Sequence, residues 1–476
     1  MSIGSILSMA RTAMNAQQTA VQVASQNISN AQTDGYTRQR IELTASVPTT
    51  YPWGTVGNGV SIADVTRTRD ALLDQSYRSA AADQSSANAT STALQQVQTI
   101  FNEPSDNGLS ATLDKFWNSW SDLANDPTNQ AAKSVVLSSG QDVATQLNQY
   151  ASQLDAADQQ NRQAMKTDVD RVNQLTQQIA DLNPKILSAE SGGHSANDLR
   201  DARDSALDEL AKLAGATVVE RENGTVGVYA AGRLLVDGSS AKTLELSNGN
   251  PPAITSPGST APLAGLGGSL GAELDLSMNR IPGVMSQLDG LASAIVTNVN
   301  AIHSTGTTYR GNPPVASPAG NFFDVTTPPP SGGDPRLTAR GIRISPTIAS
   351  ATDVAAAAGG DPGPGNNAIA LSLAQLKDST VAFTSPSGAS LGTNTIGGFY
   401  QQTIGDLATA TRHAQDDETV QNTMLGNVTT RRQSTTGVST DEELIDIIQH
   451  QHSYQAAARL VNVVDEMTQT LVQLGQ

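Results

Sequence analysis

The strongest constraint on the fold lies at the two ends of the chain, where apolar residues recur at helical spacing without a companion helix nearby in sequence. In residues 3–29 the steps of three and four residues predict one amphipathic helix, about 40 Å long at about 1.5 Å per residue. Residues 1–33 contain one charged side chain, Arg11. The apolar stripe of this helix needs a partner from elsewhere, and its larger side chains are Ile6, Leu7, Met14, Val21 and Ile28.

The C-terminal segment 440–474 predicts a second long helix. Thr440 and Glu443 have the spacing of a capping box, and Asp441 and Glu442 place negative charge at the positive end of the helix dipole. Apolar side chains then continue at helical spacing for about 50 Å, which predicts a single apolar face. That face is expected to contain Leu444, Ile447, Ile448, Tyr454, Ala457, Ala458, Val461, Val464, Met467, Leu471 and Leu474.

Mutual packing of the two terminal helices is the simplest way to cover both stripes, and it predicts a coiled-coil stem. The stem is small, its alanines bury little area, and closing a loop of roughly 400 residues costs several kcal/mol. We therefore expect the stem to be frayed or unfolded in a single chain. Alignment of many copies would bury its nearly uncharged faces and drive folding by mass action. The alternative is an ordinary interrupted domain with monomeric terminal helices.

Between its ends the chain predicts mostly helices with short β segments. Residues 70–188 are predominantly helical, with breaks near Pro104 and Pro127. Further helices are predicted at 197–214, which Gly215 ends, and at 272–302, 367–376 and 396–433. Strands are predicted at 40–46 and 58–67, in a hairpin around Asn223 and Gly224, and within 337–345. The Pro- and Gly-rich stretch 304–364 predicts a β unit dominated by loops.

These elements predict a mainly α fold with inserted β units. The N- and C-terminal helices pair as a coiled-coil stem, a long helical bundle domain follows, and a β-rich domain lies outside it. At 476 residues the chain is long enough for several domains. The expected division is a terminal coiled-coil domain of 1–33 with 440–476, a helical rod-like domain with a small β excursion (34–215 with 267–303 and 366–439), and an outer β-rich inserted region of 216–266 and 304–365.

Composition excludes several classes of function. The chain has 45 acidic and 28 basic residues, and its formal charge of −17 repels nucleic-acid phosphates and anionic lipid heads. No stretch approaches the roughly 18 apolar residues of a membrane span. The chain has no cysteine, which excludes disulfides, thiolate metal sites and a cysteine nucleophile. The first residues show no cleavable signal peptide, so the protein either stays in the cytosol or leaves by a route without one.

Motifs that could carry chemistry are weak. The run "GLGGSLG" has Gly265, Gly267 and Leu270 where a dinucleotide loop needs three glycines, so a turn or helix lead-in is favoured. His450 and His452 are two residues apart on a predicted helix and point to different sides, so they cannot share a metal ion.

The remaining polar candidates also favour structure over catalysis. His194, His303 and His413 are scattered and have no Ser or Asp constellation around them. The acidic run 416–418 is typical of a solvated helix face. We expect no enzyme activity, no catalytic or metal site and no cofactor.

Four segments resemble a known family. The stretch "MNAQQTAVQVASQNISNAQTDGYTRQRIEL" resembles the N-terminal signature of the bacterial flagellar rod, hook and junction axial proteins, and "STDEELIDIIQHQHSYQAAARLVNVVDEMTQTLVQL" resembles their C-terminal signature. Two further segments resemble the members that form the hook-filament junction: "GGSLGAELDLSMNRIPGVMSQLDGLASAIVTNVNAIHSTG" and "GNVTTRRQSTTGVSTDEEL". The resemblance is strong at both ends and at 267–306, and weak across 307–390.

This resemblance implies an extracellular structural subunit of the bacterial flagellum, exported by the type III apparatus without a cleaved signal. It implies four partners: identical subunits in a ring, the hook protein, a second junction protein next to the filament, and a cytosolic export chaperone at the C-terminal helix. Assembly residues carried over are Ile6, Leu7, Met14, Val21, Ile28, Leu444, Ile448, Tyr454, Val461, Val464 and Leu471. The signature turn contains Asn27, Asn30, Gly35 and Tyr36.

Two other functions remain open from the sequence. A distal rod or hook subunit would share both terminal signatures. An appendage-displayed hydrolase would need a convergent acid-base set, and the sequence shows none.

Overall fold

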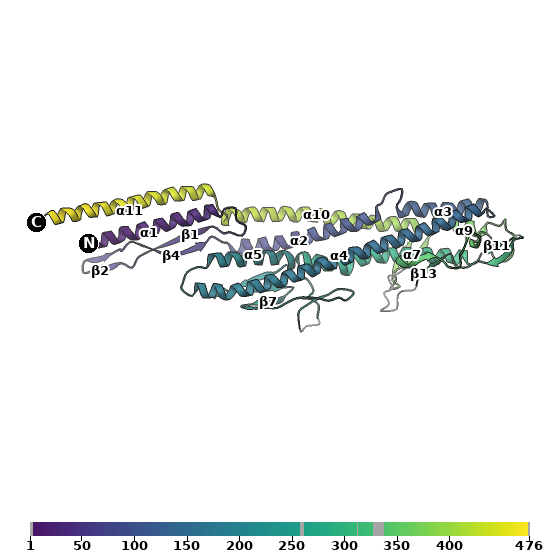
Figure 1. Ribbon diagram of the computed structural model, residues 1–476, viewed down its shortest axis with the longest axis horizontal. Helices are drawn as coiled ribbons and strands as arrows, with labels where there is room; N and C mark the ends of the chain where they lie inside the picture. The colour runs from purple at the N-terminus through teal and green to yellow at the C-terminus, as the bar shows by residue number, and fades with distance from the viewer. Residues whose placement is uncertain (1–2, 258–260, 312, 327–337, 475–476) are drawn as a thin grey trace.

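The two terminal helices lie side by side at one end of an elongated molecule (Figure 1). The computed structural model describes residues 3–257, 261–311, 313–326 and 338–474. Helix α1 (Ile3–Ser29) runs antiparallel to α11 (Thr440–Leu474), and the last turns of α11 extend beyond the start of α1. The predicted pairing of the chain ends is confirmed.

A β-hairpin covers the other side of α1. Strand β1 (Gln39–Ala45) pairs antiparallel with β4 (Val60–Arg67), and the hairpin continues into β2 (Thr49–Tyr51) and β3 (Gly54–Val56). At Gly59, which has φ +91°, a Cβ atom would lie 2.7 Å from Thr12 Oγ1 of α1, so glycine permits the close approach. Helix α1 is thus the middle of three layers.

Long helices form the rod that follows. Helix α2 (Ala71–Phe101) starts at Asp70, whose carboxylate accepts hydrogen bonds from two backbone N–H groups, and it packs along α10 (Ile396–Thr436). Helix α3 (Leu109–Asn125) leads into α4 (Gln130–Glu190), which has 61 residues and is about 90 Å long. Helix α5 (Asn197–Ala214) returns along α4 and ends at Gly215, which has φ +62°.

One apolar core lies where a small sheet packs against α4 and α5. The sheet has the order β5 (Thr217–Glu220), β6 (Val226–Ala230), β7 (Arg233–Asp237) and β8 (Ser240–Ala241), all antiparallel. A two-stranded pair follows, β9 (Glu245–Leu246) and β10 (Ile254–Thr255). The core includes Val172, Ile179, Leu207, Leu210 and Val228.

The glycine run assigned above to a turn or helix lead-in begins α6 (Gly268–Asp275). A Cβ atom on Gly215 would lie 2.7 Å from the Cα atom of Gly267, so two backbones meet here and the glycines allow that contact. A π-helical turn (Leu276–Arg280) then joins α6 to α7 (Ile281–His303), where the sequence predicts one uninterrupted α-helix.

The second core fills the far end of the rod and includes an aromatic cluster of Phe116, Trp120, Phe322 and Phe323. Around it lie helices α8 (Thr338–Gly341) and α9 (Ala368–Gln375), with 3-10 turns at Ala351–Asp353 and Leu376–Asp378. The strands pair as β11 (Thr307–Arg310) with β12 (Val315–Pro318), β13 (Phe323–Val325) with β14 (Ile342–Ile344), and β15 (Val381–Thr384) with β16 (Ser390–Asn394).

The predicted fold class, mainly α with a paired stem and inserted β units, is confirmed, with two local differences. The hairpin β15–β16 was not predicted. The two segments 216–266 and 304–365, which the sequence groups into one outer region, pack against different cores. The stretch 327–335 of the Pro- and Gly-rich segment lies outside the described residues. The division into three domains therefore remains a proposal.

The start of α11 also differs from prediction. The Ser439 hydroxyl, not that of Thr440, accepts the first-turn hydrogen bond, from the backbone N–H of Glu442 at 3.5 Å. The side chain of Glu443 does not turn back to the helix N-terminus, because it binds Arg38 and Asn27. The predicted capping box is therefore wrong.

Candidate functional site

Small side chains form the contact between the terminal helices. Helix α1 is buried mainly at alanines, and α11 is buried at Glu443, Ala457 and Val464, which lie at multiples of seven residues. His450 completes this spacing, and its Nδ1 lies 2.7 Å from Oε1 of Gln17. His450 is thus a contact residue of the helix pair, whereas His452 is exposed.

A buried polar network fixes the register of the two helices. The Asn27 side chain lies between the hairpin and α11: its Nδ2 donates to the Gln39 carbonyl at 2.9 Å and to Oε2 of Glu443 at 3.0 Å. Its Oδ1 accepts from the Tyr36 hydroxyl at 2.8 Å and from the Gln39 N–H at 3.0 Å. Every hydrogen-bonding position of this amide is satisfied, so a shift of α11 along α1 would leave buried polar atoms unpaired.

Arg38 closes the network from the other side. Its Nε donates to Oε1 of Glu443 at 2.6 Å, and its other nitrogens reach Glu442 and Asp446 at 3.0 and 3.5 Å. Burial, with the nearby charge of Asp201, raises the pKa of Tyr36 to about 12, so the phenol stays protonated and donates.

Of the signature-turn residues, the structure brings Asn27 and Tyr36 together. Gly35, with φ +81°, lies in the turn between Asn27 and Tyr36. Asn30 bonds only locally among the contacts described here, donating to the Gln26 carbonyl at 3.0 Å and lying 3.3 Å from Thr33. The sequence did not predict Arg38 and Glu443 as partners; their only signal is an arginine after the signature turn and an acidic run at the start of α11.

The predicted apolar face of α11 is not buried as a whole against α1. Val464 is buried and Val461 half-buried, but Leu444, Ile448, Tyr454 and Leu471 are exposed. On α1, Ile6, Met14, Val21 and Ile28 are half-buried and Leu7 is exposed. The physical reason is that alanines let the helices approach closely, so large side chains lie beside the contact, and that the last turns of α11 extend beyond the start of α1.

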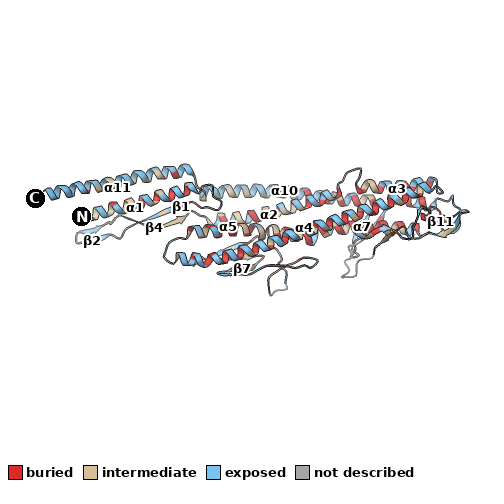
Figure 2. Ribbon diagram, in the orientation of Figure 1, coloured by how far each residue is buried: buried red, intermediate tan, exposed pale blue. Residues whose placement is uncertain are grey.

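Exposed apolar residues instead form a second stripe along α11, which we name the outer stripe. They recur at steps of three and four residues, with His452 and Ala456 in the gap, and each is 50% to 78% exposed. Figure 2 shows α11 exposed along most of its length. The outer stripe consists of Ile445, Ile448, Leu460, Val463, Met467, Leu471 and Leu474.

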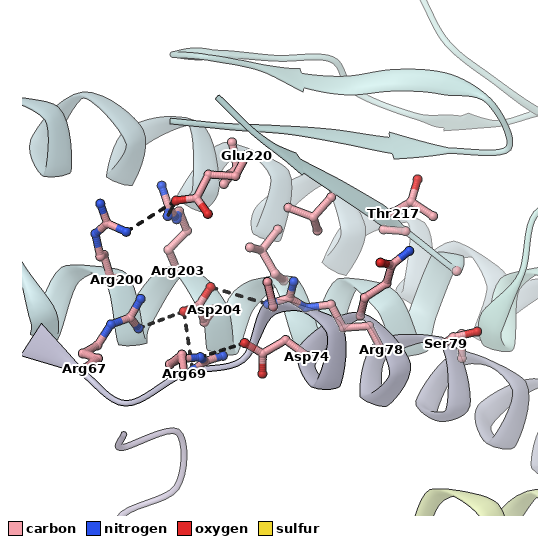
Figure 3. Close-up of a pocket in the computed structure, with 18 of the residues that line it drawn as sticks. Arg67, Arg69, Asp74, Arg78, Ser79, Arg200, Arg203, Asp204, Thr217 and Glu220 are labelled. Carbon is pink, nitrogen blue, oxygen red and sulfur yellow. Dashed lines mark hydrogen bonds and ion pairs between the residues drawn. The ribbon is translucent and has the colours of Figure 1, made fainter. Parts of the chain in front are cut away.

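Ion pairs hold the start of the rod together next to the terminal layers. We name eight residues, each with a side chain 10% to 16% exposed, the arginine–aspartate cluster: Arg67, Arg69, Arg78, Arg432, Asp74, Asp201, Asp204 and Asp208. Asp204 of α5 lies within 3.5 Å of nitrogens of Arg67, Arg69 and Arg78 (Figure 3). Arg432 of α10 bridges Asp74 and Asp208, at 2.8 Å from each.

The cavity above this cluster, about 750 Å³, does not have the electrostatics of an active site. Burial would raise the pKa of Asp204, but the charges of Arg69, Arg67 and Arg78 outweigh it, so the pKa of this carboxyl lies below its ordinary value. Asp204 therefore stays ionised and holds arginines instead of exchanging protons near neutral pH.

The other sequence candidates do not converge on a site. His194 is 3.9 Å from Asp64 at the surface, and His413 and the acidic run 416–418 lie along α10. His303 is buried within the second core. Among the described residues, no cluster of three His, Cys, Asp or Glu could hold a metal ion. No helix within the described ranges is both long and apolar enough to cross a membrane.

Comparison with known proteins decides the family. Residues 94–323 match the family described as "Flagellar hook-associated protein FlgK helical domain". Residues 7–37 match "Flagella basal body rod protein", and residues 431–474 match "Flagellar basal body rod FlgEFG protein C-terminal". Flagellar hook-associated protein 1 of Bacillus subtilis (strain 168) is 29% identical over 508 aligned positions, which cover 98% of this chain and 97% of the relative. The chain belongs to the flagellar hook-associated protein 1 family.

Other members of the hook-associated family agree. The protein of the same name from Salmonella typhimurium (strain LT2) is 29% identical over 68% of this chain and 60% of its own length. The structure titled as the flagellar hook junction protein FlgK from Burkholderia pseudomallei superposes with a TM-score of 0.63 over 77% of this chain and all of that one. At 18% identity that likeness shows the fold alone. The chain is thus a structural component of the flagellum, not an enzyme.

Proposed function

We propose that this chain is an extracellular structural subunit of the junction between the flagellar hook and filament, and that copies assemble by packing of their terminal helices. The outer stripe of α11 is the observation that carries the proposal. A folded single chain would leave this row of large apolar side chains in water, and exposed apolar surface of such length marks an interaction site. Family membership supports the place of the subunit in the flagellum.

Self-assembly fits the nearly uncharged character of α1 and of the last turns of α11. Residues 467–474 contain no charged side chain, and Arg11 is the one charge in residues 1–33. Neighbouring copies can therefore exclude water from these surfaces without stranding an ion. Because contacts with neighbours add stability only when copies meet, the terminal pair becomes fully ordered on assembly.

The assembly residues inferred from the sequence fit this proposal as a set of lateral contacts. Leu7, Leu444, Ile448, Tyr454 and Leu471 are exposed and free to meet a neighbour, while Ile6, Met14, Val21, Ile28, Val461 and Val464 support the helix pair from beside its contact. The Asn27 network, with Tyr36 and the turn at Gly35 and Asn30, sets the register in which the outer stripe is presented.

We propose four partners for the subunit. They are identical copies in a ring, the hook protein on one side, a second junction protein next to the filament on the other, and a cytosolic export chaperone that covers the C-terminal helix before export. A chaperone on α11 would shield the outer stripe, which otherwise favours premature association.

The test is complementation of a deletion strain. A strain that lacks this chain is expected to build hooks without attached filaments, and the full-length chain is expected to restore them in electron micrographs. A chain of residues 34–476 is expected to fail. Missing hooks in the deletion strain would instead indicate a rod or hook subunit, and normal swimming with residues 34–476 alone would contradict the role of the terminal helices.

A further inference from the structure

The far end of the hairpin carries a stacked aromatic pair, a half-buried tyrosine and an exposed tryptophan. We name residues 46–59 the hairpin tip; it contains β2 and β3. The rings of Tyr51 and Trp53 stack with centroids 4.9 Å apart and planes 11° apart, and Trp53 is 69% exposed. Nearby Val47 is 84% exposed. The other two tryptophans, Trp117 and Trp120, are buried in the second core, so exposure is not the rule for this side chain here.

The fold does not explain the aromatic pair. The stacked rings contribute nothing to either apolar core, and the hairpin already docks on α1 through the close approach at Gly59. Tryptophan and tyrosine are the side chains that most often anchor protein interfaces, because they bury a large area with few rotatable bonds. The pair is therefore suited to anchor a partner.

The outer stripe is positioned to receive the hairpin tip from another copy. Figure 1 shows β2 and the C-terminal half of α11 at the same end of the molecule, on opposite sides of α1. The tip cannot reach the stripe of its own chain, since α1 lies between them. If copies stand side by side in the same orientation, along the direction from the hairpin through α1 to α11, the hairpin of one copy faces α11 of its neighbour. Repetition of such a contact closes a ring or continues a helical tube.

The chemistry of the two surfaces also matches. The hairpin tip has no charged residue, and neither has the outer stripe. Both can lose water without burying an unpaired charge. Trp53, Tyr51 and Val47 offer apolar area to a stripe whose members are Leu, Ile, Val and Met, and the Met side chain adapts readily to an aromatic ring. We propose that the hairpin tip of one copy packs against the outer stripe of α11 in the next copy.

This inference rests on the proposed assembly of copies, and disulfide trapping tests it separately. The chain has no cysteine, so introduced pairs have no background. In a chain with Thr55→Cys and Val463→Cys, mild oxidation of isolated hook-filament structures is expected to give a ladder of covalent dimers, trimers and larger species. Thr55→Cys with Asn462→Cys is the matched control, because consecutive residues of a helix point to different faces. The control is expected to give no ladder.

Two results would overturn the tip-to-stripe contact while leaving the junction role intact, provided that filaments attach normally. One is that the chain with the Val463 pair gives no ladder, and the other is that both cysteine pairs give equal ladders. A second measurement uses no cysteine: Trp53→Ala, co-expressed with wild type, is expected to be incorporated about tenfold less, and Thr50→Ala to be incorporated equally. Equal incorporation of Trp53→Ala would overturn the inference even if the cysteine variants did not assemble.

Discussion

His303 lies at the centre of the second core, with both ring nitrogens in use. Its Nδ1 donates to the Gly320 carbonyl at 2.7 Å, and its Nε2 accepts from the Ala355 N–H at 3.0 Å. Burial lowers the pKa of His303 to about 4, and the charge of Lys133 acts in the same direction. The ring is therefore neutral in the folded protein at neutral pH, and it joins three segments of the far end.

Acid should weaken the far end through His303. The unfolded state binds the proton near pH 6.5 and the folded state near pH 4, so stability present above pH 6.5 is lost as pH falls to 4, by about 3 kcal/mol. Urea unfolding followed by the fluorescence of Trp117 and Trp120 at pH 7 and pH 4 measures this loss. The His303→Gln chain should be less stable at pH 7 but lose less on acidification. If the His303→Gln chain lost as much free energy of unfolding between pH 7 and pH 4 as the original chain, His303 would not be the source of the acid sensitivity. The exposed His413→Gln is the control.

Glu273 should make the folded chain less stable as the pH rises, whereas His303 does so as the pH falls. Burial, with the charge of Asp168, raises the pKa of Glu273 to about 8, and its Oε2 has no hydrogen-bond partner within the described part of the chain. Because the unfolded carboxyl ionises near pH 4.5, stability present below that pH is lost as pH rises to 8. Glu273→Gln keeps a neutral side chain, so we expect it to stabilise the chain by about 3 kcal/mol at pH 8 and by much less at pH 5. Chemical unfolding at pH 8 and pH 5 measures the change in the free energy of unfolding, with the exposed Glu222→Gln as control. An equal stabilisation by Glu273→Gln at both pH values would contradict this prediction.

At the scale of elements, Glu442 and Glu443 offer a matched pair of substitutions at the start of α11. Both bind Arg38, but the side chain of Glu443 is 3% exposed and that of Glu442 is 64% exposed. Glu443→Ala leaves Arg38 and Asn27 with unsatisfied donors, and it should destabilise the terminal pair by about 3 kcal/mol. Glu442→Ala should cost less than about 1 kcal/mol. Hydrogen exchange of the α1 and α11 amides in assembled structures measures the loss of stability in each variant. A similar loss of protection in Glu442→Ala and Glu443→Ala would show that the Asn27 network does not set the register.

The terminal helices also show which features of the fold the spacing of apolar residues can predict. Periodicity was sufficient to predict α1 and α11 as long helices and to predict helix over most of what is α4, because long helices repeat their signal many times. It did not identify the contact face of α11, since Ala457 and Glu443 give a weaker apolar signal than Leu444 or Leu471, which lie outside the contact. The hairpin β15–β16 was missed because its four- and five-residue strands contain small and polar residues.

The polar contacts of the site were harder to predict from the sequence. Arg67 and Asp201, which lie 2.6 Å apart, are separated by more than a hundred residues along the chain, and charge patterns identify partners only within one helix or hairpin. The turn residues Asn27 and Tyr36 were recognised from the family signature, but their bond to α11 through Glu443 required the fold.

At the scale of the whole molecule, Leu471→Asp should separate assembly from folding. Leu471 is exposed in a single chain, so the substitution should leave the melting temperature of the monomer nearly unchanged. In the polymer it would bury a charge without a partner, and incorporation should fall by more than tenfold. Asn462→Asp adds the same charge on another face of α11 and is the control. A large drop in the melting temperature of the Leu471→Asp monomer would mean that this residue stabilises the chain before assembly.

The arginine–aspartate cluster has a mechanical consequence. No residue of α1, the hairpin or α11 belongs to either apolar core of the described chain, and polar contacts such as Arg67 with Asp201 and Asn197 with the Val65 carbonyl join the hairpin to the rod. Arg67 of β4 lies 2.6 Å from Asp201 and 2.8 Å from Asp204 of α5, so the hairpin can change its ion-pair partner during a small tilt without exposing apolar surface. Neighbouring subunits can then lean at different angles while their cores stay rigid. We expect a ring of such subunits to bend through these tilts while each rod keeps its shape.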